Sequence, residues 1–168
     1  MALRHLIFLC LLTTVLCAKV KLDKKFIKQV VKEHNKIRAE HGVDPVKKNT
    51  KMSKYAQKWA NYLYENGKFE HRSDSKYGEN LSYMSGSAKG KDHVQNLYLQ
   101  EEQHYRDNGY YGTEPPMGDF ANFGHFTQIV WKGSTKIGVG IAGGIVVVNY
   151  DPPGNMIGDF IENVSDKS

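Results

Sequence analysis

The two cysteines of this 168-residue chain, Cys10 and Cys17, both lie close to its N-terminus. Everything after Cys17 must therefore fold without a disulfide, and it carries no thiol for catalysis. Small extracellular domains often depend on disulfides. A chain of about 150 residues, however, buries roughly 68–70% of its unfolded surface and can fold around one hydrophobic core. The pattern of apolar residues must specify that core.

The N-terminus has the pattern of a secretory signal peptide. Two basic residues precede an apolar run from Leu6 to Leu16, and Ala18 supplies a small residue for cleavage. The run is shorter than the roughly 20 apolar residues that a membrane span requires. We therefore predict a signal peptide over residues 1–18, no transmembrane segment, and a secreted chain.

Three later segments have apolar residues at helical spacing. The first covers residues 24–41, and the second covers residues 52–63 and closes at Asn66-Gly67. The third opens at Asp92, which has the chemistry of an N-cap. Its spacing predicts Glu101 on the buried face and Glu102 on the polar face. A carboxylate on a buried face needs a partner.

A β-hairpin follows the helical segments. Ile137, Val139 and Ile141 alternate with small residues, Gly143-Gly144 can form a tight turn, and residues 145–148 form an apolar run. Because the helices precede the strands without βαβ alternation, we predict a single α+β domain over residues 19–168.

A long connection between Arg106 and Gly124 is rich in aromatic residues. It carries Tyr110, Tyr111, Phe120 and Phe123. Loops of this length are often functional, so these four side chains are candidates for contact with a lipid or a partner. A self-packed loop is the equally weighted alternative.

The net charge of +5 permits attraction to anionic lipid or glycan surfaces without requiring it. The lysines are scattered, and no compact basic run or nucleic-acid reader motif is present. We therefore predict a solvated lysine-rich surface and no nucleic-acid partner.

Two ordered motifs carry a family resemblance. The run Gly124-His-Phe-Thr-Gln-Ile-Val-Trp131 and the downstream block Val147-Val-Asn-Tyr-Asp-Pro-Pro-Gly-Asn155 resemble the two signatures of the CAP superfamily. That superfamily comprises the cysteine-rich secretory, antigen 5 and pathogenesis-related proteins. The resemblance extends from His34-Asn35-x-x-Arg38 to Asn155 and implies a three-layer α-β-α sandwich. The cysteine-free core is most similar to the Golgi-associated branch.

The resemblance implies a cavity tetrad of two histidines and two acids at His71, Glu79, Glu101 and His125. Imidazoles and carboxylates suit Zn²⁺ or another divalent cation, and we take His71 and His125 as the candidate metal ligands. The alternative is a buried hydrogen-bonded network in which each acid orients a histidine.

Catalysis has weaker support in the sequence. No Gly-x-Ser-x-Gly elbow is present, and no motif pairs Ser82, Ser85 or Thr127 with a base. A metal-dependent hydrolase would use Glu79 or Glu101 as its general base. We predict His41 and His104 to be surface histidines at helix ends.

We therefore expect a secreted binding protein that contacts a lipid or sterol, a glycan surface or a protein partner, with or without a metal in the cleft. A metal-dependent hydrolase or protease is the first alternative. A non-catalytic structural protein, with the tetrad as polar core, is the second. Of the two glycosylation sequons, at Asn80 and Asn163, we expect modification only at Asn163.

Overall fold

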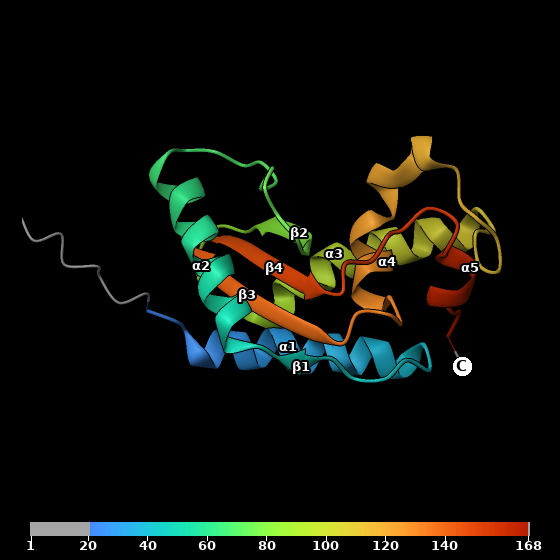
Figure 1. Cartoon of the computed structure of the whole chain (residues 1–168), viewed down its shortest axis with the longest axis horizontal. Coiled ribbons are helices and arrows are strands. Elements are labelled where there is room, and N and C mark those ends of the chain that lie inside the picture. The colour runs from blue at the N-terminus through green and yellow to red at the C-terminus, as the bar shows by residue number, and fades with distance from the viewer. Residues whose placement is uncertain (1–20, 168) are drawn as a thin grey trace, which may run out of the picture.

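The computed structural model describes residues 21–167 (Figure 1). The predicted signal peptide lies outside the described residues. In chain order the elements are α1 (Lys24–Glu40), β1 (Lys47–Lys48), α2 (Thr50–Glu65), β2 (Gly78–Tyr83), α3 (Gly90–Asp107), the 3-10 helix η1 (Met117–Asn122), α4 (Gly124–Val130), β3 (Lys136–Ala142), β4 (Ile145–Asp151) and α5 (Phe160–Asn163). Across residues 21–167, no helix has the length and apolar character needed to cross a membrane.

The strands form one sheet in the order β1-β3-β4-β2. β3 and β4 are the predicted hairpin, and its turn places Gly143 and Gly144 at φ values of 54° and 84°, which glycine adopts without steric cost. β2 pairs antiparallel with β4, whereas the short β1 pairs parallel with β3.

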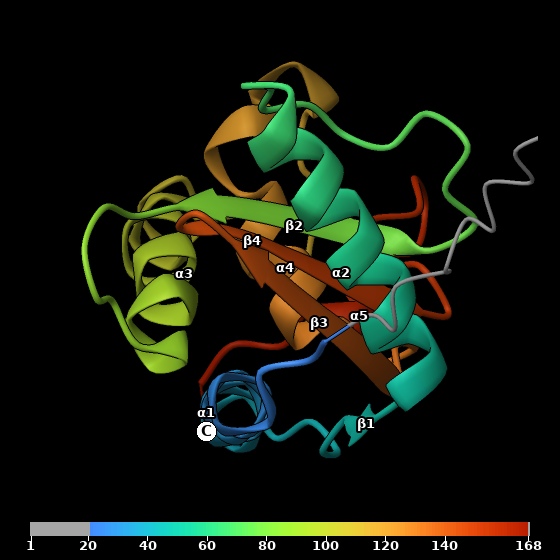
Figure 2. The same cartoon turned by 90° about the vertical axis from the view of Figure 1, so that its left-hand side faces the viewer.

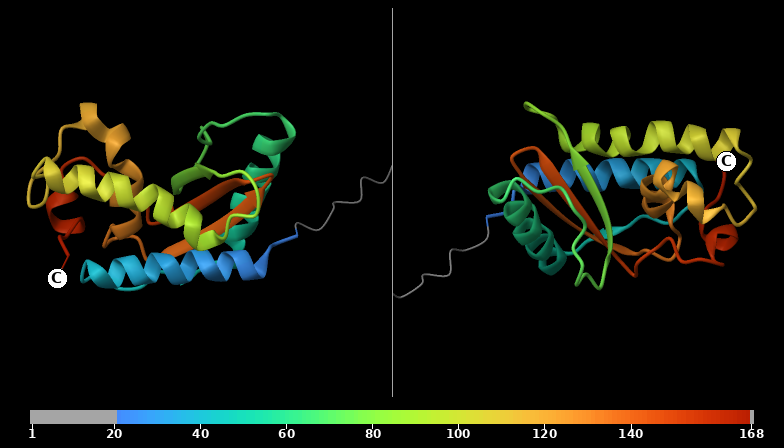
Figure 3. Two further views of the ribbon diagram at one scale, coloured as in Figure 1. Left: turned by 180° about the vertical axis from the view of Figure 1, so that it is seen from behind. Right: turned by 90° about the horizontal axis from the view of Figure 1, so that it is seen from above.

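Helices cover both faces of this sheet, so the predicted α+β three-layer sandwich is confirmed. α2 lies on one face, while α1, α3 and α4 cover the other (Figure 2). α1 and α3 run side by side, as both views in Figure 3 show. The main hydrophobic core lies between the sheet and the α1–α3–α4 layer, and a smaller cluster lies under α2.

Two glycines of β3 set the distance between α2 and the sheet. A Cβ atom added at Gly140 would lie 2.3 Å from the backbone nitrogen of Gln57, and one at Gly138 would lie 2.3 Å from the carbonyl carbon of Met52. No side chain fits there, so the backbone of α2 rests directly on β3.

α1 is tied to the rest of the fold by a buried arginine. Asp23 caps the helix by accepting a hydrogen bond from the Phe26 N–H at 2.9 Å. Near the other end, the Arg38 guanidinium donates to the carbonyls of Asp44, Ile129, Trp131 and Ser134 at 2.7–3.0 Å. Burial lowers the pKa of Arg38 to about 10. Arg38 is thus structural.

Five elements were not predicted, namely β1, β2, η1, α4 and α5, and the start of α3 was misplaced. β2 lies in a polar segment that gives no alternating pattern, and α4 occupies the first of the two family motifs, to which no element was assigned. α3 begins at Gly90 with Lys89 as its N-cap, so Asp92 is the third helical residue; its side chain accepts the Lys89 N–H at 2.8 Å.

Candidate functional site

A cleft of about 360 Å³ lies beside the first residues of β2. Its walls come from the loop before β2, from η1, from the start of α4 and from the segment after β4. The lining residues are His71, Glu79, Asn80, Phe120, Ala121, Gly124, His125 and Asn155. Three of the four predicted tetrad residues line it, and the fourth, Glu101, is hydrogen-bonded to the lining residue His125.

His71 is held by Glu79. Nδ1 of His71 lies 2.9 Å from Oε1 of Glu79, and the backbone N–H of Arg72 donates to the same oxygen at 3.1 Å. The other oxygen of Glu79 lies 3.3 Å from the side-chain amide nitrogen of Asn149. The Glu79 side chain is 5% exposed whereas that of His71 is 63% exposed. A buried carboxylate thus fixes an imidazole that reaches solvent.

His125 is held in the same way by Glu101. Nδ1 of His125 lies 2.6 Å from Oε1 of Glu101. The second carboxylate oxygen accepts the backbone N–H groups of His125 and Phe126 at 2.8 and 2.9 Å. These N–H groups belong to the first turn of α4, where no capping side chain of its own is present. Glu101 therefore orients His125 and caps α4 at once.

The carboxylates also determine the tautomer of both histidines. A carboxylate only accepts, so Nδ1 carries the proton in each ring and Nε2 of a neutral imidazole keeps its lone pair. Within residues 21–167, neither Nε2 atom has a hydrogen-bond partner. Metal-binding histidines in proteins are commonly oriented by such carboxylates.

The same geometry limits the number of protein ligands. Across residues 21–167, no group of three or more His, Cys, Asp or Glu side chains is arranged to hold a metal ion. Glu79 and Glu101 are already engaged with imidazole and backbone N–H groups. Among the side chains of this cleft, the two imidazole Nε2 atoms therefore remain without a hydrogen bond in residues 21–167, with the carboxylates as their supports.

A buried hydrogen-bonded chain supports the cleft from α1. The Nδ1 proton of His34 is donated to the Val30 carbonyl at 2.9 Å, and the Tyr150 hydroxyl donates to Nε2 at 2.7 Å. Asn80 then donates to the Tyr150 hydroxyl at 3.1 Å and to the carbonyl of His125 at 3.0 Å. Burial lowers the pKa of His34 to about 4 and raises that of Tyr150. Both groups are therefore neutral.

Asn155, which belongs to the second motif, lines the cleft and is held by Thr127. The Thr127 hydroxyl donates to Oδ1 of Asn155 at 2.7 Å, and the Asn155 side chain donates to the Gly124 carbonyl at 2.8 Å. The backbone N–H of Gly154 donates to Gln128 at 3.0 Å. The two sequence motifs are thus hydrogen-bonded to each other.

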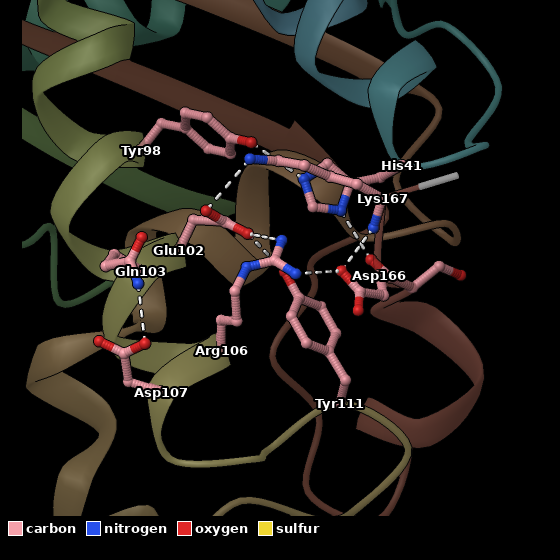
Figure 4. A network of polar contacts seen from close by, with 10 residues as sticks. His41, Tyr98, Glu102, Gln103, Arg106, Asp107, Tyr111, Asp166 and Lys167 are labelled. Carbon is pink, nitrogen blue, oxygen red and sulfur yellow. Dashed lines mark hydrogen bonds and ion pairs between the residues drawn. The ribbon is translucent and has the colours of Figure 1, made fainter.

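The prediction that Glu102 lies on the polar face of α3 was wrong, whereas the Glu101 side chain is 15% exposed and has the partner that the sequence required. Glu102 is 4% exposed and accepts hydrogen bonds from Arg106, from the Tyr111 hydroxyl at 3.1 Å and from Lys167 at 3.2 Å (Figure 4). Burial alone would raise the pKa of Glu102, but the bonds from Arg106 and Lys167 outweigh it and lower that pKa. Glu101 is half-buried and serves the cleft.

Two further predictions about polar residues need correction. His41 is buried rather than exposed, with Nδ1 2.6 Å from the Ser165 carbonyl and Nε2 3.1 Å from the Tyr98 hydroxyl. Ser82 does have a base beside it, since its hydroxyl lies 2.8 Å from Nδ1 of His93. Both residues of that pair are buried, so a substrate cannot reach them.

The aromatic loop packs on itself and on the core. Phe123 is 0% exposed, which contradicts its prediction as a contact residue. Tyr110 and Tyr111 are half-buried, and their hydroxyls donate to Asp119 at 2.9 Å and to Glu102 at 3.1 Å. Of the four aromatic candidates, Phe120 alone lines the cleft. His104, at the end of α3, pairs with Asp119 at 2.6 Å.

Comparison with known proteins agrees with this architecture. The chain is 37% identical over 145 residues to the secreted protein RBT4 of Candida albicans, covering 81% of this chain and 37% of that longer protein. It is 34% identical over 152 residues to the human Golgi-associated plant pathogenesis-related protein 1, covering 84% and 94% of the two chains. A solved structure described as NaASP2 with Zn²⁺ shares the fold, with a TM-score of 0.59 at 21% identity. The match covers 88% of each chain. The model of the cysteine-rich secretory protein family matches residues 31–150, and the chain belongs to that CAP family.

Proposed function

We propose that this chain is a secreted binding protein and that its cleft holds a divalent cation between Nε2 of His71 and Nε2 of His125. The observation that carries the proposal is the pair of histidines fixed by Glu79 and Glu101 with their Nε2 lone pairs unused. The similar structure described with Zn²⁺ supports zinc as the first ion to test.

The cleft also favours one class of organic ligand. A cation bound by two imidazoles keeps coordination positions for an anionic group. Phe120 and Ala121 supply an apolar wall beside the histidines. A ligand with a carboxylate or phosphate head and an apolar body, such as a fatty acid or a lipid, matches both features. Phe123, Tyr110 and Tyr111 contribute through packing rather than contact.

Binding is favoured over hydrolysis because the candidate bases are occupied. Glu101 accepts three hydrogen bonds, two of them from backbone N–H groups that cap α4. Glu79 accepts from His71, Arg72 and Asn149. A general base takes up a proton from the attacking water, and protonation of either carboxylate would weaken the hydrogen bonds that hold its histidine and the neighbouring backbone N–H groups.

The test is calorimetric titration of the purified protein with ZnCl₂. His71→Ala and His125→Ala should each abolish the high-affinity heat, while His104→Ala, which removes a histidine outside the cleft, should leave it unchanged. Zinc binding that survives both cleft substitutions would refute the site. Hydrolysis of peptide or ester substrates that stops with chelator and with His125→Ala would instead establish the metal-dependent hydrolase.

Secretion and glycosylation are tested on the same preparation from a eukaryotic host. We expect the recovered protein to begin near Lys19 and to carry glycan at Asn163 only. Asn80 is buried and its amide is engaged with His125 and Tyr150. Glycan mapped to Asn80, or an intact N-terminus in secreted material, would contradict these expectations.

A further inference from the structure

A second hollow of the surface lies away from the cleft, between α1 and β1. It has a volume of about 390 Å³ and is lined by Lys24, Lys28, Val31, Lys32 and Lys48. In Figures 1 and 2, α1 lies at the bottom of the molecule, whereas η1 and the loop before β2, which border the cleft, lie at the top. We call the hollow the lysine groove. It shares no residue with the cleft.

Helical spacing aligns three of these lysines. Lys24, Lys28 and Lys32 follow one another at four-residue intervals in α1, so their stems lie one above the other at steps of about 6 Å. Lys48 lies across the groove on β1. The four lysines are exposed, and within residues 21–167 none of them forms an ion pair. All charges that line the groove are positive.

This arrangement is unfavourable for the helix itself. Like charges four residues apart repel each other along a helix. The N-terminal end of a helix favours acidic side chains. Asp23 supplies one at the N-cap, but the first turn of α1 holds none and begins with Lys24 and Lys25. An anion bound along the groove would relieve both effects. The prediction that the lysines form a scattered, solvated surface misses this concentration.

We propose that the lysine groove binds a sulfated polysaccharide. Sulfates along such a chain would pair with the row from Lys24 to Lys32 and with Lys48 opposite, while Val31 on the floor contacts the sugar rings. A membrane surface fits less well, because the exposed large apolar side chains of residues 21–167 lie outside α1 and β1. Single-stranded nucleic acid fits less well because no aromatic side chain lines the groove for base stacking.

The test compares two double variants of equal charge. Lys28→Gln with Lys32→Gln removes the centre of the groove. Lys54→Gln with Lys58→Gln is the matched control, because these lysines are also exposed and four residues apart, but on α2. Binding of heparin is measured by fluorescence titration at several salt concentrations, with desulfated heparin as the ligand control. Vesicles of phosphatidylserine and phosphatidylcholine form a separate arm.

The groove variant should bind heparin about tenfold more weakly at 0.15 M salt. The slope of log K against log salt should become shallower by about two, because two fewer ion pairs form and fewer counterions are released on binding. The control should stay within twofold of the unmodified protein, and desulfated heparin should not bind. Equal weakening in both variants, no heparin binding at all, or a groove effect confined to vesicles would each overturn the proposal. Unchanged zinc titration in the groove variant shows that the cleft is intact, so this test is independent of the proposed cation site.

Discussion

Acidification should destabilise this protein through His34 between about pH 6.5 and pH 4. His34 is 1% exposed, and both ring nitrogens are engaged: Nδ1 donates to the Val30 carbonyl and Nε2 accepts from Tyr150. A second ring proton would have to displace the Tyr150 hydroxyl proton and would place a charge in the core near Arg38. Burial accordingly lowers the pKa of His34 from 6.5 to about 4.

The sign and size of the effect follow from proton linkage. In the unfolded chain His34 takes up its proton near pH 6.5, whereas in the folded chain it stays neutral until about pH 4. Between these values only the unfolded state binds the proton, so the stability falls as the pH falls and this loss is complete near pH 4. For these two pKa values the loss between pH 7 and pH 5 is about 2 kcal/mol. Burial also lowers the pKa of His41 and of His93, and both act in the same direction.

The assay is urea unfolding at pH 7, 6 and 5 of the unmodified protein and of His34→Gln. The substitution costs stability at every pH because it breaks the chain to Tyr150, so the quantity compared is the change between pH 7 and pH 5. That change should shrink by about 2 kcal/mol in the variant. Equal pH dependence in both proteins would refute the reasoning, as would an NMR titration of His34 in the folded protein with a midpoint near 6.5.

Three further changes probe packing and charge. Gly140→Ala should destabilise the fold by about 1–3 kcal/mol, because its methyl group would meet the α2 backbone at Gln57. Gly118→Ala is the control, because a Cβ atom at Gly118 meets open space. Urea unfolding of both variants should show a loss of stability in Gly140→Ala and none in Gly118→Ala. Glu102→Gln should cost about 1–2 kcal/mol, since Arg106 and Lys167 then lose their carboxylate but remain partly solvated. An unchanged unfolding midpoint in this variant would mean that water replaces the carboxylate.

Much of the fold could be predicted because its periodic segments have a clear apolar face. α1 and α2 each bury one apolar face, and the β3–β4 hairpin buries a run of apolar residues. Their boundaries differ from the prediction by a few residues. β2 was missed because its residues carry functional and polar side chains. Its strand conformation is dictated by pairing with β4, a tertiary effect that local composition does not record.

The wrong placement of Glu102 has a similar cause. With Glu101, the residues Val94, Tyr98 and Tyr105 form a row spaced by four, three and four residues. With Glu102 the spacings are four, four and three. Both rows follow one helix face, so the pattern does not distinguish the two acids. The choice depends on Lys167, which is distant in sequence and folds back onto α3 (Figure 4). The tetrad itself rests on the family resemblance, because the spacing from His71 to His125 is too wide for any local rule.

Glu101 and Glu79 offer a way to separate support of the fold from support of a cation. Both carboxylates hold a histidine through Nδ1, but Glu101 also caps the backbone N–H groups of α4, whereas Glu79 pairs within a loop and with β4. In Glu101→Gln the amide nitrogen would face either the two backbone N–H groups or the Nδ1 proton, so two bonds or one bond would be lost and a donor set against a donor.

We therefore expect Glu101→Gln to lower zinc affinity by about 10–100-fold, as loss of a ligand's supporting carboxylate commonly does. It should also cost about 1 kcal/mol of unfolding free energy through the cap. Glu79→Gln should lower zinc affinity to a similar degree with a smaller loss of stability, because no helix terminus depends on it. Calorimetric titration and urea unfolding of both variants give the two quantities. If Glu101→Gln lost stability but kept its zinc affinity, the carboxylate would be a helix cap alone, and the orientation of His125 would have to come from Asn80 and the backbone.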